Sequence, residues 1–340
     1  MTTNKRIEYI DEIKGIAIFL MVLGHVVGCT YEDYKAVCIF SPELPTNVKW
    51  GGVIWQIIYS FHMPLFFMVS GFLTYKAYRW SDTFQFCKKK IIRLFIPWVC
   101  TIWISYLRNG SVGYWFLLCL FVISILSYFE IVIMEKINAR KRLVVDLAAV
   151  FAILVFFHCL PLHDKSAWGV QYGQFMGGIL SFLIGILMRK YNQIYKLVVE
   201  SSWIYTCAIV LFIVLFSARY IPNDSLLYVI LYLKLGFVKA ILGSLVVFHI
   251  CANDALSAIR SFLSYLGRHT MPIYILHFLF ILHLYKIGEY ILLQPCAISS
   301  ITLQITYGAI ASLIAIGLSI ATYKIISVSP HLKLLMFGEK

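Results

Sequence analysis

The sequence predicts an all-α polytopic membrane protein, and three observations support this class. Of the 340 residues, 61% are hydrophobic and only 13% are charged, whereas soluble domains carry about 25% charged residues. The apolar residues gather in runs long enough to cross a hydrocarbon core of about 30 Å. Basic residues fall in short clusters between these runs, as topology determinants do. The net charge of +13 therefore reflects membrane orientation, and we expect a lipid bilayer around the chain and no nucleic-acid partner.

About ten runs are long enough to span a bilayer. They cover residues 11–29, 53–75, 91–108, 114–134, 144–161, 174–190, 203–220, 227–250, 271–293 and 302–326. Lysine and arginine concentrate in the connections on one side of these spans, and it is the cytoplasmic connections that are enriched in them. We therefore predict a single membrane domain over residues 1–340, with both termini cytoplasmic. The first run lacks a cleavage pattern after Val27, so we expect a retained helix.

The first run, Arg6 to Gly28, carries polar residues that a bilayer span ordinarily avoids. Asp11 and Lys14 stand at its start, and His25 lies eleven residues after Lys14. That spacing places Lys14 and His25 on one helix face, about 16 Å apart along the axis, with Asp11 about 40° away. A histidine deep in a span is costly and by default marks a functional site. The alternative is a packed histidine that bonds a neighbouring helix.

The second run reads WQIIYSFHMPLFFMVSGFLTYK and contains another histidine. His62 lies in its outer half, at a depth comparable to that of His25, because the two helices run in opposite directions. Pro64 favours a kink, and Ser70 can hydrogen-bond a neighbouring helix. Two histidines at one depth favour a polar pocket, although both could instead belong to the aromatic belt at the outer interface.

The third run is preceded by KKKIIRLFIPW. Arg93, at the helix start and four residues ahead of Pro97, is the candidate for receiving a polyphosphate head group such as that of coenzyme A. We interpret the lysines at 88–90 as topology anchors. Trp115 opens the fourth run, where an aromatic ring suits either the outer interface or stacking on a sugar.

The ninth run begins YLGRHTMPIYILHF. Tyr274 and His277 are three residues apart and therefore share a helix face. His277 is expected near the middle of the membrane, closer to the cytoplasmic side than His25; the alternative is a core histidine bonded to a backbone carbonyl. The nine cysteines form no CxxC pair, and no histidine or cysteine falls at metal-ligand spacing, so we expect neither a disulfide framework nor a metal site.

The motifs IDEIKGIAIFLMVLGH, FHMPLFFMVSGFL, RLFIP, YWFL and GRHTMPIYILH, in this order, resemble the acyltransferase 3 family of membrane O-acyltransferases, and in particular its fucose-4-O-acetylase-like branch. The resemblance runs from Arg6 to about His277. It implies a ten-helix bundle in the inner (cytoplasmic) cell membrane. It also implies transfer of an acyl group, commonly acetyl from cytoplasmic acetyl-CoA, to a hydroxyl of an envelope glycan, an exopolysaccharide or a lipid-linked sugar.

The family's basic-residue-x10-His motif falls on Lys14 and His25. Lys14 keeps the charge of the usual arginine but lacks its planar fork. In this interpretation His25 acts as general base or acyl relay, and Lys14 serves the donor or pairs with Asp11. The residues expected to orient the acceptor or stabilise the oxyanion are His62, Tyr274 and His277. Acyl-CoA is then a substrate, and no bound cofactor is expected.

Two other classes of membrane protein are alternatives to an enzyme. A transporter or flippase of a lipid-linked glycan or small molecule would also have many helices and buried polar residues. It predicts broken helices at equivalent places in two halves, and the sequence shows no such symmetry. A membrane sensor would ordinarily carry a soluble domain, and no run of the sequence resembles one.

Overall fold

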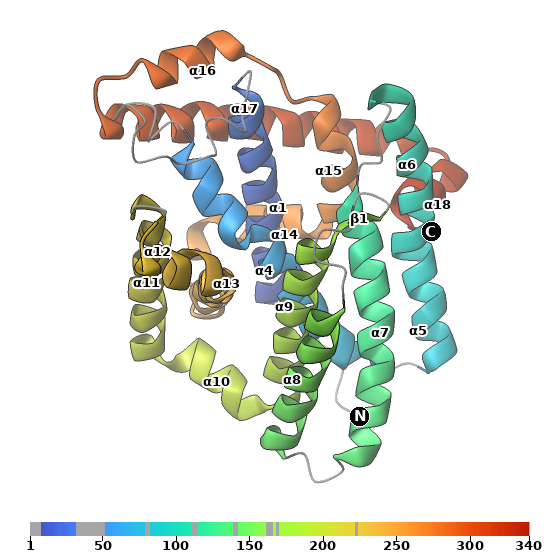
Figure 1. Cartoon of the computed structure of the whole chain (residues 1–340). Helices are drawn as coiled ribbons and strands as arrows, with labels where there is room; N and C mark the ends of the chain where they lie inside the picture. The colour runs from blue at the N-terminus through green and yellow to red at the C-terminus, as the bar shows by residue number, and fades with distance from the viewer. Residues whose placement is uncertain are drawn as a thin grey trace. The chain divides into compact units, whose positions relative to one another are not determined.

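The computed structural model describes residues 8–31, 52–78, 82–109, 114–138, 142–160, 166–167, 170–221 and 224–339. These residues are helical except for short connections and one antiparallel hairpin, β1 (Ser166–Ala167) with β2 (Val170–Gln171), as Figure 1 shows. The all-α prediction is confirmed. The chain divides into two compact units: a first unit of Met1–Leu65 with Val198–Tyr323, and a second of Phe66–Leu197 with Lys324–Lys340.

Five helices are long and apolar enough to cross a membrane: α1 (Glu8–Cys29), α4 (Val53–Tyr78), α7 (Trp115–Ile137), α9 (Tyr172–Lys190) and α17 (Ala297–Ile326). Two further pairs pass the same test but are bent, by 73° between α10 (Asn192–Glu200) and α11 (Ser202–Ser217), and by 81° between α13 (Gly236–Ala252) and residues 257–268. The described chain therefore has five candidate spans, or seven if each bent pair counts as one. It is a multi-pass membrane protein, but the predicted ten spans are not confirmed.

The remaining helices are shorter. They are α5 (Thr83–Lys90), α6 (Ile96–Asn109), α8 (Leu143–Cys159), α12 (Leu226–Tyr228), α14 (Arg260–Arg268), α15 (Thr270–Leu276), α16 (Tyr285–Leu292) and α18 (Pro330–Phe337). Short π-helical segments are η1 (Ile91–Phe95) and η3 (Val229–Lys234), and short 3-10 segments are η2 (Ala218–Tyr220), η4 (Ser257–Ile259) and η5 (His277–Leu279).

Several helices start at a side-chain cap. The Asp82 carboxylate accepts a hydrogen bond from the backbone N–H of Gln85 at 2.7 Å, before α5. Ser201 and Ser225 cap α11 and α12 in the same way. Because the first N–H groups of a helix have no partner within the helix, each cap removes an unsatisfied donor and sets the boundary.

The predicted run 271–293 is not one helix. α15 continues only through η5 to Leu279, and α16 begins anew at Tyr285. Ten residues of helix rise about 15 Å, which is half of a hydrocarbon core. Apolarity alone suggested one span, because hydropathy does not report where backbone hydrogen bonding stops.

The predicted run 91–108 is helical but begins with a π-helical turn. In η1 the Ile96 N–H donates to the Ile91 carbonyl, five residues back. Pro97 has no N–H to offer the carbonyl of Arg93, so the ordinary hydrogen-bond ladder is interrupted here. π-Helical turns of this kind re-aim side chains and are frequent at functional sites.

In the first unit, α1 crosses α14 with the two backbones in contact (Figure 1). A Cβ atom added to Gly15 would lie 2.0 Å from the Leu263 carbonyl oxygen, and one added to Gly267 would lie 1.8 Å from that of Asp11. Only glycine permits this approach. The crossing fixes the axis of α1 and thereby the position of His25.

On another face of α1, two glycines receive aromatic rings of α4. A Cβ atom on Gly24 would lie 2.9 Å from the Tyr59 ring, and one on Gly28 would lie 3.0 Å from the Trp55 ring. Trp55 and Tyr59 are themselves stacked, with ring centroids 4.1 Å apart. Trp55 and Tyr59 therefore pack against the helix that carries His25.

In the second unit, α4 and α9 make a similar close crossing. A Cβ atom on Gly71 would lie 1.9 Å from the Phe182 carbonyl oxygen, and one on Gly185 would lie 2.0 Å from that of Met68. The helical segment that follows Ser70 is thus packed against α9 through backbone contact.

Candidate functional site

Three histidines from three segments of the first unit form the candidate site. Nδ1 of His25 on α1 lies 3.2 Å from Nε2 of His277 in η5. The ring of Tyr59 lies 5.8 Å from that of His25 and 4.8 Å from that of His62 on α4, measured between centroids. His62 and His277 are 1% and 0% exposed. The two histidines predicted at one depth therefore face the same tyrosine, and His277 joins them from a distant part of the sequence.

Backbone carbonyls hold two of these rings. Nδ1 of His62 lies 2.8 Å from the Ile58 carbonyl oxygen. Nδ1 of His277 lies 3.0 Å and 2.8 Å from those of Ile273 and Tyr274. The backbone-carbonyl contact that the alternative for His277 describes is thus present at its Nδ1, and a similar contact is present in His62. Nε2 of His277 contacts His25 instead.

Aromatic rings enclose the histidines. Phe278 lies 4.5 Å from His25 and 4.3 Å from His277, centroid to centroid. Tyr274 lies farther from His277, at 6.4 Å. Within the described residues no three His, Cys, Asp or Glu side chains gather in a way that could hold a metal ion. The described site is thus a cluster of imidazole rings in contact with aromatic side chains.

Lys14 and Asp11 form an ion pair at the start of α1, with 2.7 Å between Nζ and Oδ1. Asp11 is buried and Lys14 is partly exposed. On the adjoining turn the buried Glu12 faces Arg260, with 2.9 Å between Oε1 and Nε, and Arg260 also contacts Asp254. The pairing that the sequence suggested for Lys14 is present, about three helical turns from His25.

The second unit holds Arg93 in a basic groove of about 550 Å³. Arg93, Lys88 and Lys89 are exposed along one wall. Lys333 of α18 lies on the other wall, where it contacts Glu339 at 3.5 Å. The residues that line the groove are Gln85, Lys88, Lys89, Ile92, Arg93, Lys333, Gly338 and Glu339. Cations from two distant segments thus surround a space large enough for a phosphorylated group.

Lys90 differs from its neighbours. Its ammonium group donates to Ser124 Oγ at 3.1 Å and lies 5.3 Å from the centre of the Phe86 ring. Burial, together with the charges of Lys89 and Arg93, lowers the pKa of Lys90 to about 8. The lysines at 88–90, which the sequence grouped together, therefore divide into two that line the groove and one that is packed against α7.

Ser70 and Trp115 also belong to the second unit. Ser70 is half-buried on α4, one residue before the close crossing at Gly71. Trp115 is half-buried at the start of α7, edge-on to Phe116 at 6.1 Å between centroids. Ser70 thus lies next to a helix contact and Trp115 at a helix start.

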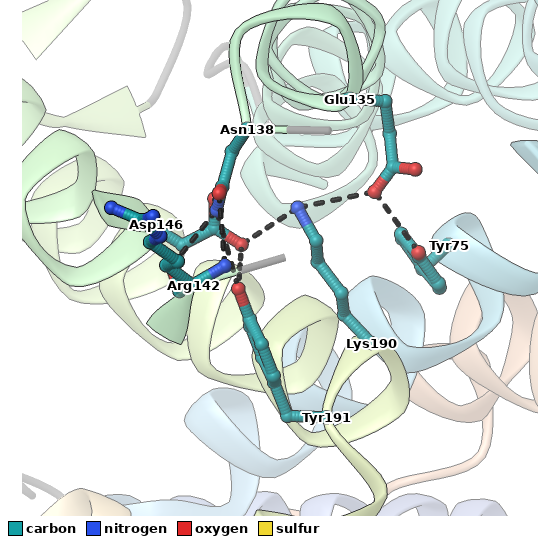
Figure 2. A network of polar contacts seen from close by, with 7 residues as sticks. All are labelled: Tyr75, Glu135, Asn138, Arg142, Asp146, Lys190 and Tyr191. Atoms are coloured by element: carbon teal, nitrogen blue, oxygen red, sulfur yellow. Dashed lines mark hydrogen bonds and ion pairs between the residues drawn. The ribbon is translucent and has the colours of Figure 1, made fainter. Parts of the chain in front are cut away.

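A charged network in the second unit was not predicted as a site (Figure 2). Lys190 lies between two carboxylates, 2.7 Å from Asp146 and 3.1 Å from Glu135. Other polar groups surround these three. The Tyr75 hydroxyl donates to Glu135, and Tyr191 and Asn138 both donate to Asp146. The backbone of Arg142 bonds the Asn138 side chain. The signal was available, since Glu135 directly follows one predicted apolar run and Asp146 lies inside the next. The sequence cannot show, however, that they face Lys190 from two other helices.

Comparison with known proteins agrees with these features. A family model described as an acyltransferase domain matches residues 7–324 and so includes parts of both units. The nodulation protein NolL of Mesorhizobium japonicum is 32% identical over 104 residues, which are 30% of this chain and 25% of NolL. The chain thus spans about a quarter of the length of that relative. No solved structure matches. From the family match, the chain belongs to the acyltransferase 3 family.

Proposed function

We propose that the protein is a membrane O-acyltransferase. It takes an acyl group, acetyl in the simplest case, from acyl-CoA and transfers it to a hydroxyl of a cell-envelope or exopolysaccharide glycan, polymeric or lipid-linked, at the inner cell membrane. Family membership supports the reaction class. The observation that carries the chemistry is the imidazole of His25, hydrogen-bonded to His277 within an enclosure of aromatic rings.

Acyl transfer from a thioester to a hydroxyl requires a base near neutral pKa, which imidazole provides. As the hydroxyl oxygen bonds to the carbonyl carbon, His25 takes the hydroxyl proton. The carbon–sulfur bond then breaks, the sulfur takes that proton from His25, and coenzyme A leaves as the free thiol. If the acyl group first moves to His25 and then to the acceptor, the same residue acts as nucleophile. Both routes run through His25, and the apolar surroundings limit hydrolysis of the thioester.

The backbone contact of His62 restricts its role. A carbonyl accepts but cannot donate, so the contact with Ile58 places a proton on Nδ1 of His62. Neutral His62 then carries a lone pair on Nε2, which can accept a hydrogen bond from the sugar hydroxyl but cannot donate one to an oxyanion. His62 is thus proposed to orient the acceptor. Among the predicted residues Tyr274, with its hydroxyl, suits the oxyanion.

For the donor, the basic groove supports the proposal that Arg93 binds the phosphate groups of acyl-CoA. Arginine presents paired N–H groups to a phosphate, and the exposed Lys88 and Lys89 add charge to the same wall. Ser70 and Trp115 remain proposed as further substrate contacts. Lys14, paired with Asp11, is proposed to support α1 at its start.

The donor proposal predicts a change in KM. Arg93→Ala should raise KM for acetyl-CoA about tenfold, because one charge-assisted phosphate contact contributes about 1.4 kcal/mol, and should leave kcat nearly unchanged. Steady-state kinetics in detergent micelles measure both constants. Lys136→Ala, an exposed lysine of α7 outside the groove, is the matched control. An unchanged KM in Arg93→Ala would contradict the donor site.

The reaction itself is tested with radiolabelled acetyl-CoA supplied to the cytoplasmic side of membranes that contain wild type or His25→Ala. We expect wild type to label the glycan and the variant, at equal abundance, to lose about 10³-fold in rate, within the range of general-base effects. His249→Ala serves as control, because that histidine stacks on Tyr205 of α11, outside the three-histidine site.

Equal labelling by wild type and His25→Ala would refute the proposal. If neither labels the glycan but glycan export falls in the variant, the transporter or flippase alternative replaces it. The helix pairs bent by 73° and 81° favour this alternative, because transporters use broken helices at their substrate sites.

A further inference from the structure

The hydrogen bond between His25 and His277 has a direction, and the backbone sets it. Nδ1 of His277 lies within hydrogen-bond distance of two carbonyl oxygens, those of Ile273 and Tyr274. Because carbonyl oxygens only accept, this nitrogen must carry a proton. In neutral imidazole the second nitrogen is then unprotonated. Nε2 of His277 is therefore an acceptor.

This acceptor faces His25. The distance of 3.2 Å from Nε2 of His277 to Nδ1 of His25 is that of a hydrogen bond, and with Nε2 as acceptor the proton must lie on Nδ1 of His25. The other nitrogen of His25, Nε2, then holds the lone pair. The His25 ring also bonds the backbone carbonyl of Met21, one turn earlier in α1. We infer that His277 is a positioning residue that, together with this carbonyl, keeps His25 in the tautomer whose Nε2 can take a proton from a hydroxyl or attack a thioester. The inference rests on the proposed role of His25.

The fold holds His277 firmly enough for this role. Its ring is fully buried, and it begins η5, where α15 changes into a 3-10 turn. The backbone N–H of His277 also donates to the Ile273 carbonyl. Because backbone and ring of His277 both bond carbonyls of the last turn of α15, the orientation of the ring is coupled to the helix end.

Aromatic contacts limit rotation of both rings. Phe278 lies against His25 and His277, at 4.5 Å and 4.3 Å between centroids. The rings of His25 and His277 are 5.0 Å apart and inclined by 34°. A flip of His277 would put Cδ2 where Nδ1 lies and Cε1 where Nε2 lies, so the flipped ring would lose its bonds to Ile273 and Tyr274 inside an apolar site. The observed ring orientation is therefore strongly favoured.

Proton placement of this kind belongs to a general pattern, in which a third group orients the catalytic base. In serine proteases the orienting group is a carboxylate, and its amide variant, which imposes the wrong tautomer, lowers kcat about 10⁴-fold. His277 would supply the orientation without a negative charge. A neutral acceptor selects the tautomer of His25 but stabilises its protonated form less than a carboxylate does, so we expect a smaller effect, about 10²-fold on kcat.

The test uses two replacements of His277 in the full-length protein, with purified enzyme in micelles and acetyl-CoA as donor. His277→Gln places an amide oxygen near the former Nε2 and can still accept from Nδ1 of His25. His277→Leu cannot. We expect His277→Leu to lose about 100-fold in kcat with KM for acetyl-CoA within about twofold of wild type, and His277→Gln to stay within about tenfold of wild-type kcat. His249→Leu, in the same unit, controls for loss of a histidine.

A merely structural role would lower the abundance of both variants without separating glutamine from leucine in kcat, and that result would overturn the inference. Nitrogen-15 NMR of the histidine-labelled wild type in nanodiscs gives a readout that does not depend on either variant. We expect a protonated Nδ1 and an unprotonated Nε2 for His25, assigned by the signal that disappears in His25→Ala. A wild-type His25 protonated on Nε2 would overturn the inference directly.

The His25→Ala and His277→Leu variants together distinguish a failure of this inference from a failure of the proposed function. If His25→Ala keeps wild-type activity, the proposed function fails. If His25→Ala is inactive but His277→Leu keeps wild-type kcat, the proposed function stands and the positioning role of His277 is refuted.

Discussion

Gly267→Ala is expected to leave little or no folded protein. A Cβ atom at this position would lie 1.8 Å from the Asp11 carbonyl oxygen, and a backbone atom cannot rotate away as a side chain can. The crossing of α1 and α14 would have to open along its length, with loss of the contact at Gly15 as well. We expect a destabilisation of at least about 3 kcal/mol, at or above the upper end of overpacking effects. Thermal unfolding monitored by size-exclusion chromatography in detergent measures it.

Gly317→Ala is the matched control in the same unit. Nothing lies within 4 Å of the position that its Cβ atom would take. Alanine is also favoured over glycine in a helix by up to about 1 kcal/mol. This variant should unfold at or slightly above the wild-type temperature. Equal stability of Gly267→Ala and Gly317→Ala would show that α1 and α14 do not touch as described.

Lys190→Met is expected to give the second large loss. The side chain of Lys190 is 4% exposed, and that of Asp146 is 5% exposed. Without the ammonium group, the buried carboxylate of Asp146 and the partly buried carboxylate of Glu135 would lose their cationic partner (Figure 2). Removing one partner of a buried ion pair costs about 3–5 kcal/mol. We expect the midpoint of thermal unfolding to fall by on the order of 10 °C, measured by differential scanning fluorimetry.

Two comparisons isolate the charge effect. Lys136→Met removes an exposed lysine next to Glu135 and should change the midpoint little. The double variant Lys190→Met with Asp146→Asn removes one stranded carboxylate and should recover part of the loss, because the cost comes mainly from uncompensated charge. A loss in the double variant equal to the sum of the two single losses would instead indicate that Lys190 acts through packing alone.

The sequence predicted the helices well where apolar residues and helix continuity coincide. α1, α4, α7, α9 and α17 each fall on a predicted run. The prediction failed where an apolar run is not one continuous helix. The run 271–293 is apolar throughout, yet the helix stops at Leu279, because the end of a helix depends on backbone hydrogen bonds that hydropathy does not measure.

The candidate site was predictable in its members but not in its arrangement. His25, His62 and His277 stood out because histidine is rare and costly in an apolar run. Their order in space was beyond the sequence, since it depends on packing such as the contact of Tyr59 with Gly24. The tautomers depend in turn on carbonyl groups, such as that of Ile273, which every residue carries alike.

Lys333 shows the same limit in the second unit. It follows the last apolar run, and local spacing gives no sign of a site there. The structure places it in the same groove as Arg93, which lies 240 positions earlier in the chain. Residues that meet only through the fold leave no mark in local spacing.

The hydrogen bond between His25 and His277 joins residues 252 positions apart. The proposed base is therefore made early in translation and its partner late. A nascent chain that has inserted α1 carries the imidazole and its contact with the Met21 carbonyl but lacks the acceptor that His277 supplies. Assembly of the proposed reactive centre thus waits until most of the polypeptide has left the ribosome.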